Sequence, residues 1–410
     1  MKIKKILYIL VLLIMVLALS GIVFERHMES EEPSAEPSVL WQSEPPEVSS
    51  PPAPEESDLI EETPEIDPVS QRALEIMSEM SDWEKLCQLF VVRPQAVTGN
   101  VTGQENIAEG LSSYPVGGFI FFSDNLWQGG ESTRQTISAM QQSSKLGLII
   151  SADEEGGRVE RLMSALGTTR LSAMLSYQNE PAVTAYENAA IIANDMKGFG
   201  FNTDYAPVAD VFSNPSNTVI GDRAYSTDFK TAEVLIPSAV RGFLENDILC
   251  SLKHFPGHGD TYEDSHNSAA TVNKTLAQLR EEELLPFIAG IEAGSPMVMI
   301  GHLTVPDIDT KPATTSYKII TELLREELGF EGVVISDSLE MGAITGTKSD
   351  RLAVEAISAG MDILLCIEDL PLALTGLQEA LETGELTMER IEESVFRVLS
   401  MKIQYGLIAA

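Results

Sequence analysis

The chain has 410 residues and a mass of 44.6 kDa, and hydrophobic residues make up 44% of it. This length and apolar content allow one large folded domain or two ordinary ones, and they exclude a chain that is disordered throughout. The formal charge of −35, from 62 acidic and 27 basic residues, argues against a nucleic-acid partner, because phosphates need a basic surface.

The chain begins with a basic segment followed by a long apolar one. Lys2, Lys4 and Lys5 precede an uncharged apolar run over residues 6–24. A spanning helix needs about 20 apolar residues, whereas a signal peptide has a shorter apolar region and then small residues. The run continues past Ala18 and Ser20, so we expect residues 1–24 to be an uncleaved anchor, with a cleaved signal peptide as the alternative. The lysines before the apolar run predict that the N-terminus stays in the cytoplasm and that the rest of the chain is extracytoplasmic. The protein would then contact the membrane only through this segment.

Residues 25–68 are predicted to form a disordered acidic linker. Between residues 25 and 70 there are nine prolines, fourteen acidic residues and one arginine. Such a segment repels itself and has too little apolar surface to form a core. We therefore assign the folded domain to residues 69–410.

The rest of the chain alternates short apolar runs with amphipathic helical stretches such as 274–292 and 317–327. Eight runs are interpreted as strands, at residues 89–92, 116–122, 146–150, 203–208, 248–252, 297–300, 332–335 and 362–366. Apolar strands that alternate with helices are typical of a parallel sheet covered on both faces. We therefore predict an α/β fold with a (β/α)₈ TIM-type barrel. A doubly wound open sheet is the alternative, but no GxGxxG follows an early strand and no GxxxxGK[ST] occurs.

The three cysteines do not suggest a disulfide framework or a zinc ribbon. Cys87, Cys250 and Cys366 lie far apart, each among apolar residues, and no CxxC pair occurs. We expect them to be small buried side chains.

Polar residues follow most of the predicted strands, namely Asp153, Asp210, Lys253, His254, His302 and Asp337. A single Asp after a strand is more often a helix cap. In a barrel, however, the strand ends meet on one face, where the active site lies. So many polar strand ends together predict a site there.

Three of the five histidines, His254, His258 and His266, fall within residues 253–266. Such a segment is compatible with a metal site or with acid–base chemistry that needs no metal. Pro256 and Gly257 exclude the helical HxxxH arrangement that zinc favours. We therefore expect neither a metal nor a cofactor.

This segment, which reads KHFPGHGDT and ends in Asp264-Ser-His266, resembles the signature of glycoside hydrolase family 3 β-N-acetylhexosaminidases of the NagZ type. The resemblance covers roughly residues 70–407 and includes the segments 153–161, 206–210, 220–223 and 335–341. The Asp264-x-His266 pair is similar to that of the family's N-acetylglucosaminidases rather than its β-glucosidases. The resemblance implies a retaining exo-enzyme that removes terminal β-linked GlcNAc. With export, it suggests peptidoglycan-derived fragments as the substrate.

The resemblance also implies roles for individual residues. Asp337 is the expected nucleophile, and a His266–Asp264 dyad is the expected acid/base, where retaining enzymes usually have a second carboxyl group. Imidazole titrates near neutrality and can both give and take a proton, while Asp264 would fix its tautomer. The expected sugar-binding residues are Asp153, Arg161, Arg223, Lys253 and His254.

Four further residues are expected to act at the edge of the site. Glu154, where the family usually has Gln, is expected to add charge beside Asp153 and to alter substrate binding. His258 is expected to brace its loop, and Asp210 and His302 to line or brace the pocket.

Three rival functions remain open. The first is a family 3 phosphorylase or broad-specificity β-glucosidase/N-acetylglucosaminidase, and the second is a non-catalytic wall-binding barrel. The third is a metal-dependent hydrolase, which activity in the presence of a chelator would exclude. The expected partner is a GlcNAc-containing glycan or muropeptide, and we expect a monomer.

Overall fold

The computed structural model describes residues 67–262, 270–341 and 346–409. Eight parallel strands form one sheet in the order β12-β9-β7-β6-β3-β2-β1-β13. These strands are β1 (Phe90–Val92), β2 (Gly118–Ile120), β3 (Ile149–Ala152), β6 (Thr203–Asp204), β7 (Leu249–Phe255), β9 (Met297–Ile300), β12 (Val333–Ser336) and β13 (Leu364–Leu365). Each of them overlaps one of the eight predicted runs.

The sheet curls into a nearly closed barrel, consistent with the TIM type. Its first and last strands in sheet order, β12 and β13, meet where Ile335 bridges Ile363 in parallel. The Ser336 N–H donates to the Ile363 carbonyl at 3.0 Å, and the Leu339 N–H donates to Leu365 at 2.9 Å. Near-closure leaves little unpaired strand edge, and it brings all the strand ends onto one face.

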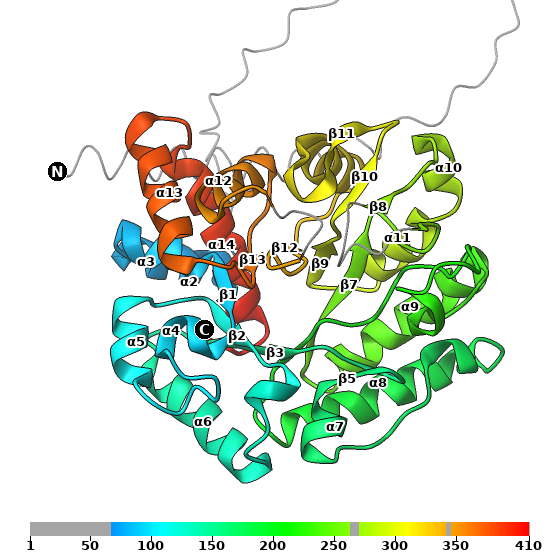
Figure 1. The fold of residues 1–410 in the computed structure, drawn as a ribbon, viewed down its shortest axis with the longest axis horizontal. Helices are drawn as coiled ribbons and strands as arrows, with labels where there is room; N and C mark the ends of the chain where they lie inside the picture. The colour runs from blue at the N-terminus through cyan, green and yellow to red at the C-terminus, as the bar shows by residue number, and fades with distance from the viewer. Residues whose placement is uncertain (1–66, 263–269, 342–345, 410) are drawn as a thin grey trace, which may run out of the picture. The chain divides into compact units, whose positions relative to one another are not determined.

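Helices surround the strands (Figure 1). The α-helices are α2 (Pro68–Glu79), α3 (Asp82–Gln88), α4 (Pro94–Thr98), α5 (Ile107–Ser113), α6 (Gly130–Ser143), α7 (Arg161–Leu166), α8 (Ala182–Lys197), α9 (Phe229–Leu244), α10 (Leu276–Glu281), α11 (Leu284–Glu292), α12 (Ser349–Ala359), α13 (Leu370–Thr383) and α14 (Met388–Gln404). A π-helical segment, η5, covers Lys318–Glu327, and short 3₁₀ turns include η1 (Ser123–Asn125) and η3 (Gly221–Arg223). The first described helix begins at Pro68 with Asp67 as its cap.

Two smaller sheets lie outside the barrel. One is a hairpin of β4 (Glu154–Gly156) and β5 (Val159–Glu160). The other joins β8 (Ala270–Thr271), β10 (Leu303–Val305) and β11 (Asp309–Pro312). Both follow barrel strands, so they lie on the face where the strand ends meet.

The barrel interior is filled by apolar side chains from the strands, including Val91, Ile149, Leu249, Met299 and Ile335. Val398 and Met401 of α14 belong to the same cluster, and Leu407 packs against it. A Cβ on Gly147, just before β3, would lie 1.8 Å from the Leu407 carbonyl oxygen. The last helix and the residues after it therefore pack against the end of the barrel where the strands begin.

Some local predictions were correct and others were not. The three cysteines are buried, as predicted. The stretch 274–292 is two helices rather than one, because Glu282 leaves the helical conformation with φ −130° and ψ −93°. The predicted strand 203–208 shortens to β6, with one further bridge from Val208 to Lys253.

Among the described residues, no helix is long and apolar enough to cross a membrane. The predicted anchor and nearly all of the predicted linker lie outside the described residues, so those two predictions stay untested.

Candidate active site

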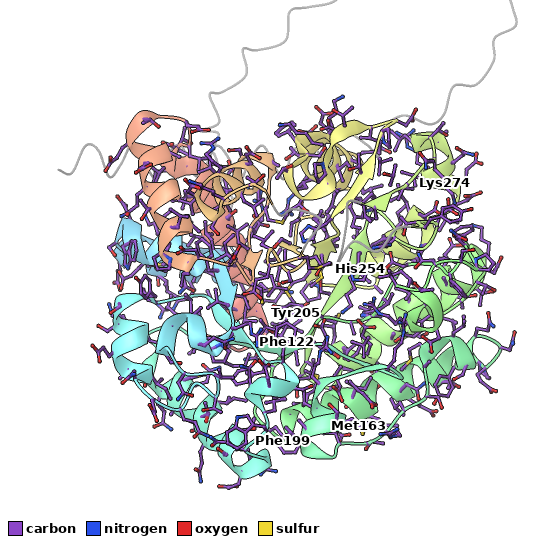
Figure 2. The ribbon with its side chains drawn as sticks, viewed as in Figure 1. Phe122, Met163, Phe199, Tyr205, His254 and Lys274 are labelled. Atoms are coloured by element: carbon purple, nitrogen blue, oxygen red, sulfur yellow. The ribbon has the colours of Figure 1, made fainter. Side chains whose placement is uncertain are left out.

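A cavity of about 280 Å³ opens where the barrel strands end. Six of the predicted site residues line it, namely Asp153, Arg161, Arg223, Lys253, His254 and Asp337. Figure 2 shows His254 near the middle of the ring of helices, with Phe199 and Lys274 farther out. The predicted acid/base pair, Asp264 and His266, lies outside the described residues. The structure therefore brings together every predicted site residue that it describes.

Strands β12 and β7, which lie on either side of β9 in the sheet, supply three of these side chains. Asp337 directly follows β12, and its N–H donates to the Ile300 carbonyl of β9 at 2.9 Å. Lys253 and His254 lie in β7, where the pairing with β9 shifts register between Leu252 and Phe255. A bulge of this kind redirects side chains along a strand. It explains how two consecutive residues can both line the cavity.

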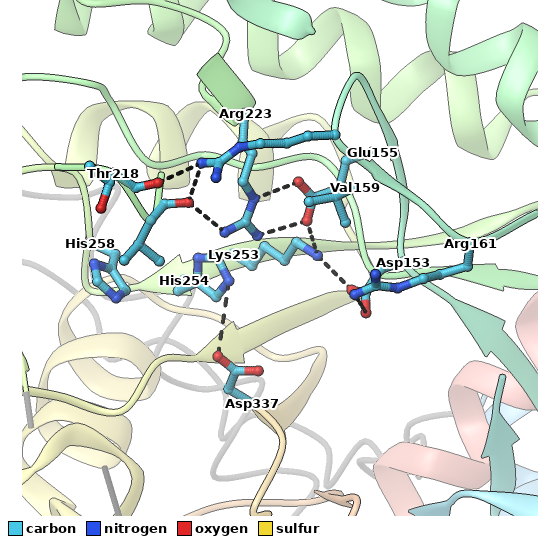
Figure 3. A pocket seen from close by; sticks show the side chains of 12 residues that line it. Asp153, Glu155, Val159, Arg161, Thr218, Arg223, Lys253, His254, His258 and Asp337 are labelled. Carbon is cyan, nitrogen blue, oxygen red and sulfur yellow. Dashed lines mark hydrogen bonds and ion pairs between the residues drawn. The ribbon is translucent and has the colours of Figure 1, made fainter. Parts of the chain in front are cut away.

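Alternating charges form a chain along one wall (Figure 3). The Lys253 ammonium lies 2.7 Å from an oxygen of Asp153 and 2.6 Å from one of Glu155. The Arg223 guanidinium binds Glu155 in a bidentate pair, with both distances 2.8 Å. Arg161 lies 3.9 Å from Asp153. The wall therefore presents fixed donors and acceptors, which can orient a polar ligand in the cavity.

The ion pairs within this wall determine whether its side chains are charged. Burial would lower the pKa of the Lys253 ammonium, but Asp153 and Glu155 outweigh burial and raise it. Burial would raise the pKa of Glu155, but Arg223 and Lys253 together hold it far below its usual value. Both groups therefore stay charged at neutral pH.

Sequence reasoning missed Glu155 and misplaced its neighbour Glu154. The Glu154 carboxylate accepts hydrogen bonds from the N–H groups of Leu162, at 2.8 Å, and Met163, at 2.9 Å, at the start of α7. The expectation that Glu154 adds charge beside Asp153 in the pocket was therefore wrong. Alternation along an extended chain could have shown this, because residues two apart share a face.

Asp337 is held as a carboxylate with some access to solvent. Its side chain is 16% exposed, and one oxygen lies 4.0 Å from Nε2 of His254. The other oxygen accepts the Ser338 N–H at 2.7 Å. Burial would raise the pKa of Asp337, but His254, His302 and the Ser338 N–H lower it below its usual value. An ionised, accessible carboxylate at this position is suited to nucleophilic attack.

Asp210 braces the two described histidines on this side of the cavity, as predicted. One of its oxygens lies 2.6 Å from Nδ1 of His254, and the other accepts the His258 N–H at 2.6 Å. The first contact directs Nε2 of His254 towards the cavity. Burial outweighs the effect of Asp210 and lowers the pKa of His258 to about 4, so this imidazole is neutral at pH 7. His302 also has a bracing position, with Nε2 2.8 Å from the Ser338 carbonyl oxygen.

The charged wall adjoins a loop held by Arg158, which sequence reasoning did not single out. One of its guanidinium nitrogens donates to three consecutive carbonyl groups, those of Thr218 (2.9 Å), Val219 (2.6 Å) and Ile220 (3.0 Å). Arg223 also donates to the Val219 carbonyl, at 3.2 Å. Arg158 and Arg223 therefore fix the backbone of this loop from two sides.

A second hollow of about 400 Å³ adjoins the cavity and shares Asp153, Arg161 and Asp337 with it. Its other lining residues are mainly apolar and include Ile120, Phe122, Met299 and Leu365, with the charged Arg93 and Glu340 also present. The guanidinium groups of Arg93 and Arg161 lie 5.0 and 5.5 Å from the centre of the Phe122 ring. The mouth of the barrel is thus polar on one side of Asp337 and partly apolar on the other.

Within residues 67–262, 270–341 and 346–409, no three His, Cys, Asp or Glu side chains are arranged to hold a metal ion. The prediction of a metal-free reaction stays a prediction, for which a chelator is the test.

Comparison with known proteins identifies the family. The model for the "Glycosyl hydrolase family 3 N terminal domain" matches residues 83–401. Beta-hexosaminidase A of Pseudoalteromonas piscicida is 34% identical in an alignment of 334 residues, and the match covers 72% of this chain and 54% of that protein. Beta-hexosaminidase LpqI of Mycobacterium tuberculosis is 35% identical in an alignment of 357 residues, and the match covers 83% of this chain and 88% of that protein.

A solved structure agrees with these matches. The glycoside hydrolase family 3 beta-N-acetylglucosaminidase from Paenibacillus sp. str. FPU-7 superimposes with a TM-score of 0.74 at 35% identity. The match covers 80% of this chain and 63% of that one. With the barrel and its strand-end cavity, these matches show that the chain belongs to glycosyl hydrolase family 3.

Proposed function

We propose that this chain is a retaining exo-β-N-acetylglucosaminidase that removes terminal β-linked GlcNAc from cell-wall fragments or related glycans. The observation that carries the proposal is the position of Asp337, an accessible carboxylate in the same 280 Å³ cavity as the charged wall of Asp153, Lys253 and Arg223. Relatives named beta-hexosaminidase and a neighbour named beta-N-acetylglucosaminidase support the choice of sugar.

The proposed reaction has two steps. The Asp337 carboxylate attacks the anomeric carbon while His266 gives its proton to the departing glycosidic oxygen, which leaves as an alcohol. A water molecule then attacks the glycosyl-enzyme, and His266 takes its proton. GlcNAc is released with its β configuration, and Asp337 returns to a carboxylate. Asp264 would orient the His266 ring and stabilise the imidazolium.

The charged wall would bind the terminal sugar. Asp153 can accept hydrogen bonds from hydroxyl groups, while Lys253, Arg161 and Arg223 can donate to them or to the acetamido carbonyl. His254 would approach the sugar beside the reacting carbon, because its Nε2 lies 4.0 Å from Asp337. Glu155 joins this set as the residue that fixes Arg223 and Lys253 in place.

The natural substrate and the location follow from the rest of the chain. We propose residues 69–410 as the catalytic domain, residues 25–68 as a spacer and residues 1–24 as an anchor or signal. Export would place the domain near peptidoglycan, so muropeptides are the proposed source of GlcNAc.

The test is to assay the full chain on a chromogenic β-GlcNAc glycoside and on the matching β-glucoside, with a chelator present. We expect turnover of the GlcNAc substrate only. Asp337→Asn should lose activity by on the order of 10⁴–10⁶-fold, the scale on which loss of a covalent nucleophile acts. A 5-fluoro GlcNAc analogue should label the wild type on the peptide that contains residue 337.

Other results would favour the rivals. Turnover of the glucoside would favour a broad-specificity enzyme, and formation of GlcNAc-1-phosphate in phosphate buffer would favour a phosphorylase. A folded wild type that turns over neither the dyes nor a muropeptide would favour the binding barrel. Loss of activity with the chelator would favour a metal-dependent hydrolase.

A further inference from the structure

The buried side chain of Asp204 continues the pairing of β6 with β3 past the end of both strands. Asp204 is the last residue of β6 and is fully buried. Its Oδ1 accepts the backbone N–H of Glu154 at 2.9 Å. The next residue, Tyr205, donates its backbone N–H to the Ala152 carbonyl at 3.0 Å. The end of β6 therefore binds the carbonyl group before Asp153 and the N–H group after it, and a side chain supplies the second of these bonds.

The N–H group that Asp204 binds lies between the two carboxylates of the charged wall. Asp153 and Glu155 both contact the Lys253 ammonium, at 2.7 and 2.6 Å (Figure 3). Side chains two residues apart share one face in an extended chain, so both contacts require residues 153–155 to keep this conformation. Asp153 also lines both hollows beside Asp337. A shift of this backbone would therefore separate Asp153 from Lys253 and change the shape of the cavity.

The surroundings of Asp204 favour a neutral carboxyl group. Among the residues that the structure describes, none forms a hydrogen bond with its Oδ2. Burial raises the pKa of Asp204 well above its usual value, against the lowering effects of the Glu154 N–H and the Lys253 ammonium. A protonated carboxyl group still has a carbonyl oxygen that accepts an N–H. Asp204 can therefore hold the backbone without competing with Asp153 and Glu155 for Lys253.

We propose that Asp204 is a positioning residue for sugar binding, because its side chain fixes the backbone that follows Asp153. This inference rests on the proposed function, in which Asp153 and Lys253 bind the terminal sugar. It assigns no contact between Asp204 and the substrate. Its consequence is that the wall needs an acceptor oxygen at position 204 but does not need a negative charge there.

Two substitutions separate the acceptor from the charge. Asp204→Asn keeps a carbonyl oxygen in nearly the same shape and cannot ionise, while Asp204→Leu has a similar size and lacks the acceptor. Asp362→Asn is the matched control. The Asp362 carboxylate is also fully buried and accepts a backbone N–H, that of Val334 at 2.9 Å. It pairs with Arg325 and Arg397 just before β13, at the end of the barrel where the strands begin.

The measurement is kcat and KM of the full chain on a chromogenic β-GlcNAc glycoside, with the inhibition constant of free GlcNAc as a second measure of binding. For Asp204→Leu, we expect both KM and the inhibition constant to rise on the order of tenfold, because the N–H of Glu154, a residue only 4% exposed, loses its acceptor. We expect kcat to stay within about threefold, because binding is lost equally from the ground state and the transition state. Asp204→Asn should match the wild type in all three constants. Asp362→Asn should lower stability and leave the three constants unchanged.

An unchanged KM for Asp204→Leu would overturn the proposal. An equal rise in KM for Asp204→Asn and Asp204→Leu would also overturn it, because the charge rather than the acceptor would then be required. If Asp204→Leu does not fold, Asp204→Ala replaces it, since it also removes the acceptor and its side chain is small enough for the same space. A wild type that is inactive on every GlcNAc glycoside would instead refute the proposed function, and the two failures are therefore distinguishable.

Discussion

Glu154 and Glu155 offer a matched pair of substitutions, because they are adjacent in β4 but their carboxylates contact opposite surroundings. Glu155→Gln removes the negative charge that Arg223 and Lys253 share. Glu154→Gln removes charge from the start of α7 instead. We expect the first variant to weaken substrate binding and the second to leave it nearly unchanged.

The size of the effect follows from the contacts. The side chains of Glu155 and Lys253 are each 2% exposed, and removing one partner of a buried ion pair costs about 3–5 kcal/mol. Lys253 keeps Asp153 at 2.7 Å, so we expect a loss near the lower end, about 3 kcal/mol of unfolding free energy. If the sugar-binding wall shifts and about half of this free energy is lost from substrate binding, kcat/KM falls on the order of tenfold, mostly through a higher KM.

The smaller effect expected for Glu154→Gln has a separate cause. Its amide oxygen can still accept the Leu162 N–H, so the loss should be about 1 kcal/mol, the scale of one hydrogen bond. Urea unfolding and the kinetics of a chromogenic β-GlcNAc glycoside would measure both variants. An equal rise in KM for the two, or an unchanged KM for Glu155→Gln, would refute the assignment of Glu155 to the wall.

Three further predictions test the brace, the barrel base and the pH dependence of stability. Asp210→Asn should lower kcat/KM on the order of 10²–10⁴-fold with the fold retained, because an amide at 2.6 Å from Nδ1 of His254 no longer fixes the tautomer of that imidazole. Circular dichroism would check the fold and kinetics the activity, and an activity within threefold of wild type would contradict the prediction. Gly147→Ala should lower the free energy of unfolding by about 1–3 kcal/mol with KM unchanged, because its Cβ would lie 1.8 Å from the Leu407 carbonyl oxygen. Chemical unfolding would measure this loss, and an unaltered midpoint would be evidence against the packing of Leu407 at the end of the barrel where the strands begin. Burial lowers the pKa of Lys402 from 10.5 to about 7, so the unfolded chain binds more protons than the folded one between these pH values. The free energy of unfolding therefore rises with pH in this window, by at most about 1.4 kcal/mol per pH unit. Lys402→Met should flatten this rise between pH 7 and 10, and equal slopes for the two proteins would show that Lys402 does not cause it.

The sequence predicted those parts of the fold that depend on local patterns. Each of the eight barrel strands is a short apolar run, and such runs can be recognised without knowing their neighbours. The break between α10 and α11 was missed because both halves continue one amphipathic pattern, and the conformation of Glu282 depends on packing. The shortness of β6 was missed for a similar reason, since the apolar run continues while the regular pairing stops after Asp204 and leaves only the bridge at Val208.

The site was predictable to the extent that its residues end strands or match a family motif. Asp337, Lys253 and His254 meet both conditions, and the structure places them in one cavity. Glu155 could have been found from alternation along β4, although its pairing with Arg223 could not.

The seam of the barrel has a consequence for how the protein is made. Phe90 of β1 pairs with Leu364 of β13, and α2 packs against α14. The earliest described elements therefore lack these partners until about the last tenth of the chain has been synthesised. Until synthesis reaches that point, the edge of β1 remains open to other strands. Such long-range closure is slow and exposes the chain to aggregation. We therefore expect nascent chains that stop before β13 to be bound by chaperones, and release to follow once α14 has emerged.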